Sequence, residues 1–151
     1  VSSSMDFTSE ERDQLYIAAL LHDIGKLAID NEIINKPGRL DDQERFEIDT
    51  HTYYTRWILG KIHGFEQITE WAANHHEKLN GSGYPYGKTS KDLDYFSRVI
   101  AIADIYQALT EARPYRDPMP MTKVYAILND MAQKNELDQD LLNTMIEKKI
   151  L

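Results

Sequence analysis

The sequence predicts an all-α protein, a bundle of about six or more helices. Apolar residues recur at helical spacing along most of the chain, and no convincing stretch alternates apolar with polar residues as a strand would. Capping signals precede the apolar segments, and glycine or proline separates them. At 151 residues and 42% hydrophobic content, the chain suits one compact domain over residues 1–151.

The first predicted helix begins at a capping box. Thr8 and Glu11 have the spacing of that motif, and the apolar run LYIAALLHD follows them. Gly25 is expected to end this helix. Residues 27–40 show no clean period, and the Lys-Pro-Gly sequence at 36–38 predicts a turn.

A second capping signal at residues 41–44 predicts a helix that continues to about Leu59 and carries His51. Gly60 and Gly64 bracket the next break. The glycine-rich segment 80–87 is incompatible with a helix. The remaining helices are predicted over about residues 66–76, 92–111, 122–134 and 138–149.

Composition narrows the functional classes. The formal net charge of −8 and the pI near 5.0 argue against non-specific binding to duplex nucleic acid or to an anionic membrane surface. No apolar run approaches the roughly 20 residues that span a bilayer. The absence of cysteine excludes a disulfide framework and cysteine zinc sites, and we expect a cytoplasmic protein.

Histidine and aspartate side chains gather in short clusters that suggest a metal site. An ordinary structural role competes for each: His22 and Asp23 can cap a helix end, His75 and His76 can form a solvated helix terminus, and a lone helical histidine such as His51 is more often structural. We assign His63 to such a structural role. Asp104 lies in a strongly apolar helical stretch, where a carboxylate needs a metal or a firm partner. The coincidence of these fragments favours a metal site with nitrogen and oxygen ligands.

The order of these motifs resembles the HD-GYP phosphodiesterases, bacterial members of the HD metal-dependent phosphohydrolase superfamily. The resemblance covers nearly the whole chain. It implies an HD-type helical bundle and hydrolysis of cyclic di-GMP, or a related cyclic dinucleotide, to a linear dinucleotide or GMP. The motifs that carry it are His22-Asp23-Ile24-Gly25-Lys26, His51, the run from His75-His76-Glu77 to Gly83-Tyr84-Pro85, Asp104, and the loop Arg113-Pro114-Tyr115-Arg116.

The same resemblance implies roles for individual residues. Asp23 would bridge two metal ions, with His22 and Asp104 on one ion. The second ion would be held by His51, His75 and His76. Catalytic roles are expected for Asp23, Lys26 and Gln107, and substrate contacts for Lys26, Gly83, Tyr84, Pro85, Arg113 and Arg116.

The donor set also indicates the cofactors. Two divalent ions, or three as in some family members, are expected, with iron or manganese as the native metal and zinc or nickel able to occupy the site. The expected partners are the cyclic dinucleotide, an upstream sensory or receiver domain and signalling proteins. No membrane contact is expected from this domain.

Three departures from the family pattern leave alternatives open. Gln107 stands where family members usually carry an aspartate, and Thr55 where they tend to have glycine. The family's first helix supplies a further histidine, so with 21 residues before His22 we expect that helix to be missing here. The main alternative is a degenerate domain that binds nucleotide or a partner without turnover. A general HD phosphohydrolase acting on mononucleotides is disfavoured, because it has no need of the Gly-Tyr-Pro loop.

Overall fold

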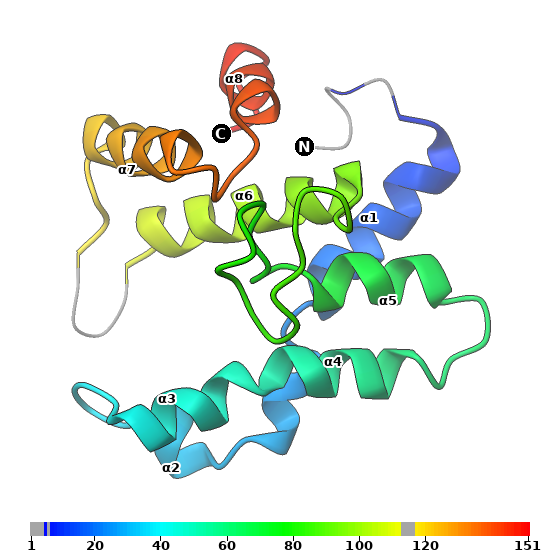
Figure 1. Cartoon of the computed structure of the whole chain (residues 1–151), viewed down its shortest axis with the longest axis vertical. Helices are drawn as coiled ribbons and strands as arrows, with labels where there is room; N and C mark the ends of the chain where they lie inside the picture. Colours follow the sequence, from blue (N-terminus) through cyan, green and yellow to red (C-terminus); the bar gives the residue numbers. More distant parts are fainter. Residues whose placement is uncertain (1–4, 6, 113–116) are drawn as a thin grey trace.

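Helix α6 (Tyr95–Thr110) runs through the middle of the molecule, and helices that precede and follow it in the chain pack against it (Figure 1). The structure is a computed structural model that describes Met5, residues 7–112 and residues 117–151. The other elements, in chain order, are α1 (Ser9–Leu21), the 3₁₀ helix η1 (Ile24–Ala28), α2 (Asn31–Ile34), α3 (Asp42–Asp49), α4 (His51–Leu59), α5 (Glu66–Ala73), α7 (Met121–Gln133) and α8 (Gln139–Glu147).

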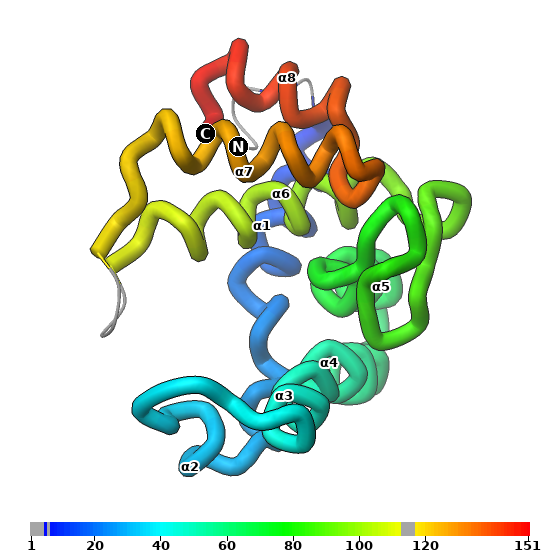
Figure 2. The backbone as a smooth tube through the Cα atoms, turned by 60° about the vertical axis from the view of Figure 1, so that its left-hand side comes forward, coloured from blue at the N-terminus to red at the C-terminus, as the bar shows by residue number. Residues whose placement is uncertain are grey.

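The buried apolar side chains form one core cluster, and the helices are arranged toward two ends of the molecule. Helices α7 and α8 stack over α6 at one end, whereas α2, α3 and α4 form the opposite end (Figure 2). Helices α1 and α5 pack against each other between these ends. The fully buried side chains come from most of these elements and include Ala18, Leu59, Trp71, Ile102, Leu128, Leu142 and Met145.

The predicted capping signals are confirmed. Thr8 and Glu11 form a reciprocal capping box at the start of α1, and Asp41 and Glu44 form another at the start of α3. Asp94 caps α6 by accepting a hydrogen bond from the Ser97 N–H at 2.8 Å, so this helix begins three residues later than predicted.

The single helix predicted from the 41–44 cap to about Leu59 is wrong, because the chain breaks at Thr50 into α3 and α4. The Thr50 N–H bonds the carbonyls of Glu47 and Ile48, and its hydroxyl donates to the Glu47 carbonyl at 2.6 Å. These local hydrogen bonds tighten the last turn of α3 and compete with the regular hydrogen bonds of an α-helix. His51 therefore becomes the first residue of α4.

The all-α prediction is confirmed. No strand forms in the described ranges; Asn80 and Thr89 make an isolated bridge that joins the two ends of the glycine-rich loop. The short helix α2 lies within the segment 27–40 that showed no clean period, and η1 begins just before that segment. Helix α5 ends at Ala73 instead of reaching His76, so both adjacent histidines lie in the turn that follows it.

Candidate metal centre

The His22-Asp23 turn follows α1 and is fixed onto the start of α4. Gly25 lies so close to α4 that an added Cβ would come within 1.9 Å of the His51 carbonyl oxygen. Its N–H donates to Thr55 Oγ1 at 3.1 Å, and the same hydroxyl donates to the His22 carbonyl at 2.9 Å. Gly25 and Thr55 thus hold the His22-Asp23 turn, here called the HD turn, next to His51.

The His75-His76 turn is held from the other side by the glycine-rich loop. Gly83 packs on this turn, since a Cβ there would lie within 2.5 Å of the His76 carbonyl oxygen. The Tyr84 N–H donates to that carbonyl at 3.2 Å, and the Tyr84 ring lies 4.9 Å from the His76 ring between centroids. The loop that the sequence singled out therefore forms one wall of the site.

Glu77 organises this loop, a role that the sequence reasoning missed. Its side chain is buried, with 3% relative exposure. One carboxylate oxygen accepts from the Tyr86 N–H at 2.8 Å, and the other accepts from the Lys88 N–H at 2.9 Å. The available signal was its position, directly after the two histidines and before the glycine-rich loop.

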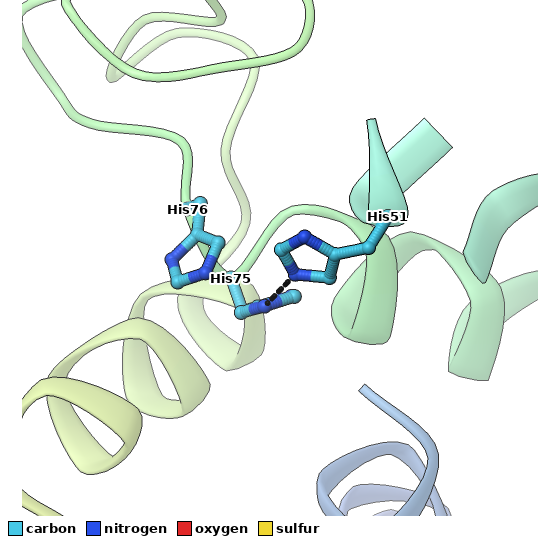
Figure 3. Close-up of side chains that lie close together, drawn as sticks. All are labelled: His51, His75 and His76. Atoms are coloured by element: carbon cyan, nitrogen blue, oxygen red, sulfur yellow. Dashed lines mark hydrogen bonds between the residues drawn. The ribbon is translucent and has the colours of Figure 1, made fainter. Parts of the chain in front are cut away.

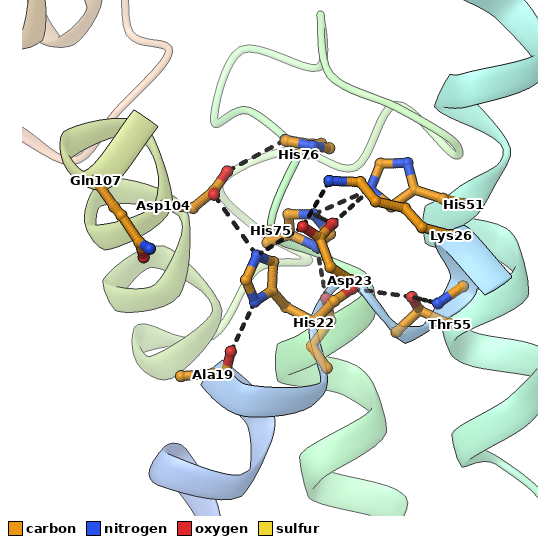
Figure 4. Close-up of polar contacts among 12 residues, drawn as sticks. Ala19, His22, Asp23, Lys26, His51, Thr55, His75, His76, Asp104 and Gln107 are labelled. Atoms are coloured by element: carbon orange, nitrogen blue, oxygen red, sulfur yellow. Dashed lines mark hydrogen bonds and ion pairs between the residues drawn. The ribbon is translucent and has the colours of Figure 1, made fainter. Parts of the chain in front are cut away.

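The six predicted metal ligands lie together in one cleft, here called the His–Asp cleft: His22, Asp23, His51, His75, His76 and Asp104 (Figure 4). Asp23 lies at its centre, with Oδ1 3.4 Å from His51 Nε2 and 3.8 Å from His75 Nε2. Asp23 Oδ2 and Asp104 Oδ1 lie 3.4 and 3.6 Å from His22 Nε2. Two ligands that each lie about 2.1 Å from one ion are separated by about 3 to 3.6 Å, so this spacing suits donor atoms that share cations.

The orientation of three imidazoles defines which nitrogen faces the cleft. In each of these rings Nδ1 lies against a backbone carbonyl, which only accepts hydrogen bonds, so Nδ1 carries the proton and a neutral ring presents the Nε2 lone pair. The pairs are His22 with Ala19 at 2.7 Å, His51 with Ile48 at 2.6 Å, and His75 with Ala72 at 2.7 Å.

The Nε2 atoms of His51 and His75 approach each other to 3.2 Å (Figure 3). With Nδ1 protonated in both rings, two lone pairs face each other across this gap. Asp23 Oδ1 is also buried there and accepts no hydrogen bond from any described residue. Unpaired acceptors gathered in this way repel one another unless a cation lies among them. The residues therefore fit a divalent metal ion.

The pKa shifts of Asp23 and of three of the four histidines agree with this fit. Burial acts to lower the pKa of His22, but the hydrogen bond with Asp104 and the nearby carboxylates outweigh it and that pKa is raised. Burial lowers the pKa of His51, lowers the pKa of His75 well below its usual value, and lowers the pKa of His76 to about 3 with help from neighbouring positive groups. Burial works to raise the pKa of Asp23, but the hydrogen bond from Lys26 and the nearby positive groups outweigh it and the pKa is lowered. Neutral imidazoles and an ionised carboxylate are the forms that bind metals.

Within the described residues, the donor atoms fall into two groups of three. His51, His75 and His76 form one group; His22, Asp23 and His75 form the other, and the donor atoms in each group lie within 4.8 Å of one another. The first group coincides with one predicted ligand set. Asp104 lies between the two sets, 3.6 Å from His22 and 3.8 Å from His76. The distribution of ligands between ions remains a prediction.

Only some of the predicted catalytic and substrate residues line the His–Asp cleft. Lys26 Nζ lies 2.5 Å from Asp23 Oδ2, and Tyr84 lines the cleft, which has a volume of about 450 Å³. Gln107 also lines the cleft, but its Nε2 donates to Glu111 Oε1 at 2.7 Å, and Figure 4 draws no contact between this side chain and the histidines. Pro85 follows Tyr84 in the loop. The predicted substrate residues Arg113 and Arg116 lie outside the described residues.

No helix in the described part of the chain is long and apolar enough to cross a membrane.

The chain belongs to the HD domain family, whose model matches residues 1–141. This assignment confirms the resemblance stated from the motifs. HD domains are metal-dependent, in agreement with the histidine and aspartate donors gathered in the cleft.

Curated relatives carry consistent names. The chain is 40% identical over 146 residues to a 3′3′-cGAMP-specific phosphodiesterase 1 of Vibrio cholerae serotype O1, covering 97% of this chain and 34% of the relative. It is 34% identical over 139 residues to the cyclic di-GMP phosphodiesterase response regulator RpfG of Xanthomonas campestris pv. campestris, covering 91% and 36%. It is 32% identical over 123 residues to a cyclic di-GMP phosphodiesterase of Thermotoga maritima, covering 80% and 33%. The chain thus spans about a third of the length of these relatives.

Proposed function

We propose that this domain is a metal-dependent phosphodiesterase that hydrolyses a cyclic dinucleotide in bacterial signalling. One observation carries the proposal: the Nε2 lone pairs of His51 and His75 and the unpartnered Asp23 Oδ1 converge in a cleft lined by Lys26. Relatives named for cyclic di-GMP or for 3′3′-cGAMP support these two molecules as the substrates to test.

The proposed cofactor is a pair of divalent ions, iron or manganese, held by the six residues of the His–Asp cleft. Such ions would polarise the phosphodiester as Lewis acids and lower the pKa of an attacking water. Asp23 is the proposed residue between the two ions, because its two oxygens face different histidines. A third ion is not required by the donors in the described residues.

The chain's own residues would bind and orient the substrate. Lys26 places an ammonium group at the cleft, where it can donate to a phosphate oxygen while holding Asp23. Tyr84 presents its ring beside His76, as the wall against which the nucleotide lies. Hydrolysis adds the water oxygen to phosphorus, breaks the P–O3′ bond and returns a proton to the leaving 3′ oxygen, giving a linear 5′-phosphorylated dinucleotide.

A second candidate function is a nucleotide-binding domain without turnover. Gln107 favours it, because this amide is hydrogen-bonded to Glu111 and makes no drawn contact with the histidines in Figure 4. If a carboxylate at position 107 must handle a proton, the amide cannot replace it. A cytoplasmic location, an additional sensory or receiver domain and signalling protein partners belong to either version of the proposal.

The decisive experiment is turnover by the metal-loaded protein. The chain is reconstituted anaerobically with Fe(II) or Mn(II), incubated with cyclic di-GMP or 3′3′-cGAMP, and its products are separated by chromatography. The proposal expects a linear dinucleotide. Tight nucleotide binding with no product, for either metal, would support the binding domain instead. Activity gained by Gln107→Asp would then identify the amide as the cause.

A further inference from the structure

A second cavity, of about 580 Å³, opens beside the His–Asp cleft and has a different character. We call it the basic side pocket and define it by Lys26, Ile29, Arg39, Leu40, Arg45 and Ile48. Its lining residues come from η1, α2, α3 and the segments that join them. Helices α2 and α3 lie at one end of the molecule (Figure 2). Three of these residues, Lys26, Arg45 and Ile48, also line the His–Asp cleft, so the two cavities adjoin each other.

The charges of the two cavities are opposite. The residues lining the basic side pocket include three cations and no carboxylate, in a chain whose formal net charge is −8. The His–Asp cleft is lined by carboxylates that include Asp23, Asp49, Asp104 and Glu111. A local positive field in an acidic protein attracts anions to that one place.

The two arginines of the pocket are available to a ligand. In the described part of the chain, no ion pair joins Arg39 or Arg45 to a carboxylate, and both side chains are exposed. Glu44, on the same helix as Arg45, pairs with Lys36 at 2.6 Å instead. Guanidinium groups bind phosphate through paired N–H donors.

Apolar surface lies next to these cations. Ile29, which is buried, and Leu40 and Ile48, which are half-buried, all line the pocket. A pocket of several hundred Å³ that combines apolar walls with a few charged groups is typical of small-molecule binding sites. This combination fits a nucleotide, which carries a flat base and a phosphate.

We propose that the basic side pocket binds the second nucleotide half of a cyclic dinucleotide while the scissile phosphate lies at the His–Asp cleft. Arg39 and Arg45 would bind the second phosphate, and Ile29 and Leu40 would contact the base. Lys26 lines both cavities and would contact both halves of the cyclic dinucleotide. This inference rests on the proposed function and adds to it, because it makes Arg39 and Arg45 the residues that distinguish a cyclic dinucleotide from a diester with one phosphate.

The test compares two substrates on the full chain loaded with Mn(II). Cyclic di-GMP carries two phosphates, and bis(p-nitrophenyl) phosphate carries one. Arg39→Ala and Arg45→Ala should each lower the ratio of kcat/KM for cyclic di-GMP to kcat/KM for the small diester by about tenfold, mainly through KM. Arg39→Lys should recover part of the loss. Lys123→Ala, which removes an exposed cation on the distant helix α7, should leave the ratio unchanged.

A binding measurement separates this inference from the proposed function. Fluorescently labelled cyclic di-GMP is titrated with the wild-type chain and with each arginine variant. About tenfold weaker binding to both arginine variants supports the pocket, even where the wild type gives no product and the proposed function fails. Equal binding by wild type and variants, or an unchanged substrate ratio, would overturn the pocket proposal while leaving turnover at the cleft intact.

Discussion

The His–Asp cleft and the basic side pocket adjoin each other but are built differently. In the cleft, His51 and His75 are buried and their Nδ1 atoms are fixed by backbone carbonyls. In the side pocket, Arg39 and Arg45 are exposed and have no ion-pair partner among the described residues. The first arrangement is fixed before any ligand arrives, as metal coordination requires. The second leaves its side chains free to adjust to an anion.

The largest effect is expected from removing a buried ligand of the cleft. His75→Ala deletes a nitrogen that belongs to both groups of donors, so metal affinity should fall at least a hundredfold and turnover should be lost with it. Metal content after dialysis, measured by inductively coupled plasma mass spectrometry, checks this. His63→Ala is the matched control, because His63 is exposed and lies outside both groups. Unchanged metal content in His75→Ala would refute the ligand assignment.

Lys26 sharpens the comparison because it lines both cavities. Lys26→Met should lower kcat/KM for the cyclic dinucleotide by about a hundredfold, since it removes a cation from the phosphate site. Metal content should stay near that of the wild type, because Lys26 donates no ligand atom. Steady-state kinetics and metal analysis on the same sample test this. Parallel loss of metal and activity would mean that Lys26 acts mainly by holding Asp23.

Thr55 tests how the cleft is fixed to the fold. Thr55→Val would leave the Gly25 N–H and the His22 carbonyl without their buried partner, at a cost of about 2 kcal/mol in the free energy of unfolding. Thr55→Ser keeps the hydroxyl and should recover most of that loss. Urea denaturation of both variants measures it. A Thr55→Val variant that is more stable than Thr55→Ser would show that the methyl group, and not the hydroxyl, holds the HD turn.

The smallest effect is expected at Glu70, which forms ion pairs with Arg56 and with Lys88 of the glycine-rich loop. The hydrogen bond from Arg56 lowers the pKa of Glu70 from 4.5 to about 2, and Lys88 in the loop adds to this from 3.0 Å. The folded pKa is depressed, so the stabilisation is present above the unfolded pKa and is lost as pH falls from about 4.5 toward about 2. Because the group is more than a third exposed, its contribution is about 1 kcal/mol.

Urea denaturation of wild type and Glu70→Gln at about pH 6 and about pH 3 measures this contribution. The wild type should be the more stable protein at the higher pH, and the difference should shrink at the lower pH. A difference independent of pH would mean that Glu70 acts through its shape and not through its charge.

Local patterns foretold much of the fold. Capping boxes at Thr8 and Asp41 marked true helix starts, because those interactions involve residues only three positions apart. The break at Thr50 was not predicted, because it depends on whether the Thr50 hydroxyl donates to a backbone carbonyl or to water. The short helices η1 and α2 were also not predicted, because an element of one or two turns is too short to display a period.

In the candidate site, too, local patterns could be predicted and contacts between distant residues could not. The histidine and aspartate clusters were visible in the sequence, and the motif order indicated that they belong together. Their tautomers were not visible, because these depend on backbone carbonyls at Ala19, Ile48 and Ala72. The roles of Thr55 and Glu77 depend on contacts with distant parts of the chain. The basic side pocket had no sequence motif of its own, since its cations come from three separate places: η1, the segment between α2 and α3, and α3.

The most direct test of the central claim is anomalous X-ray diffraction from crystals of the Mn(II)-loaded protein. The account predicts two manganese peaks about 3.5–4 Å apart, with Asp23 between them and Nε2 of both His51 and His75 directed at the ions. A cleft that shows no manganese peak under saturating metal, with His51 and His75 hydrogen-bonded directly to each other, would contradict it.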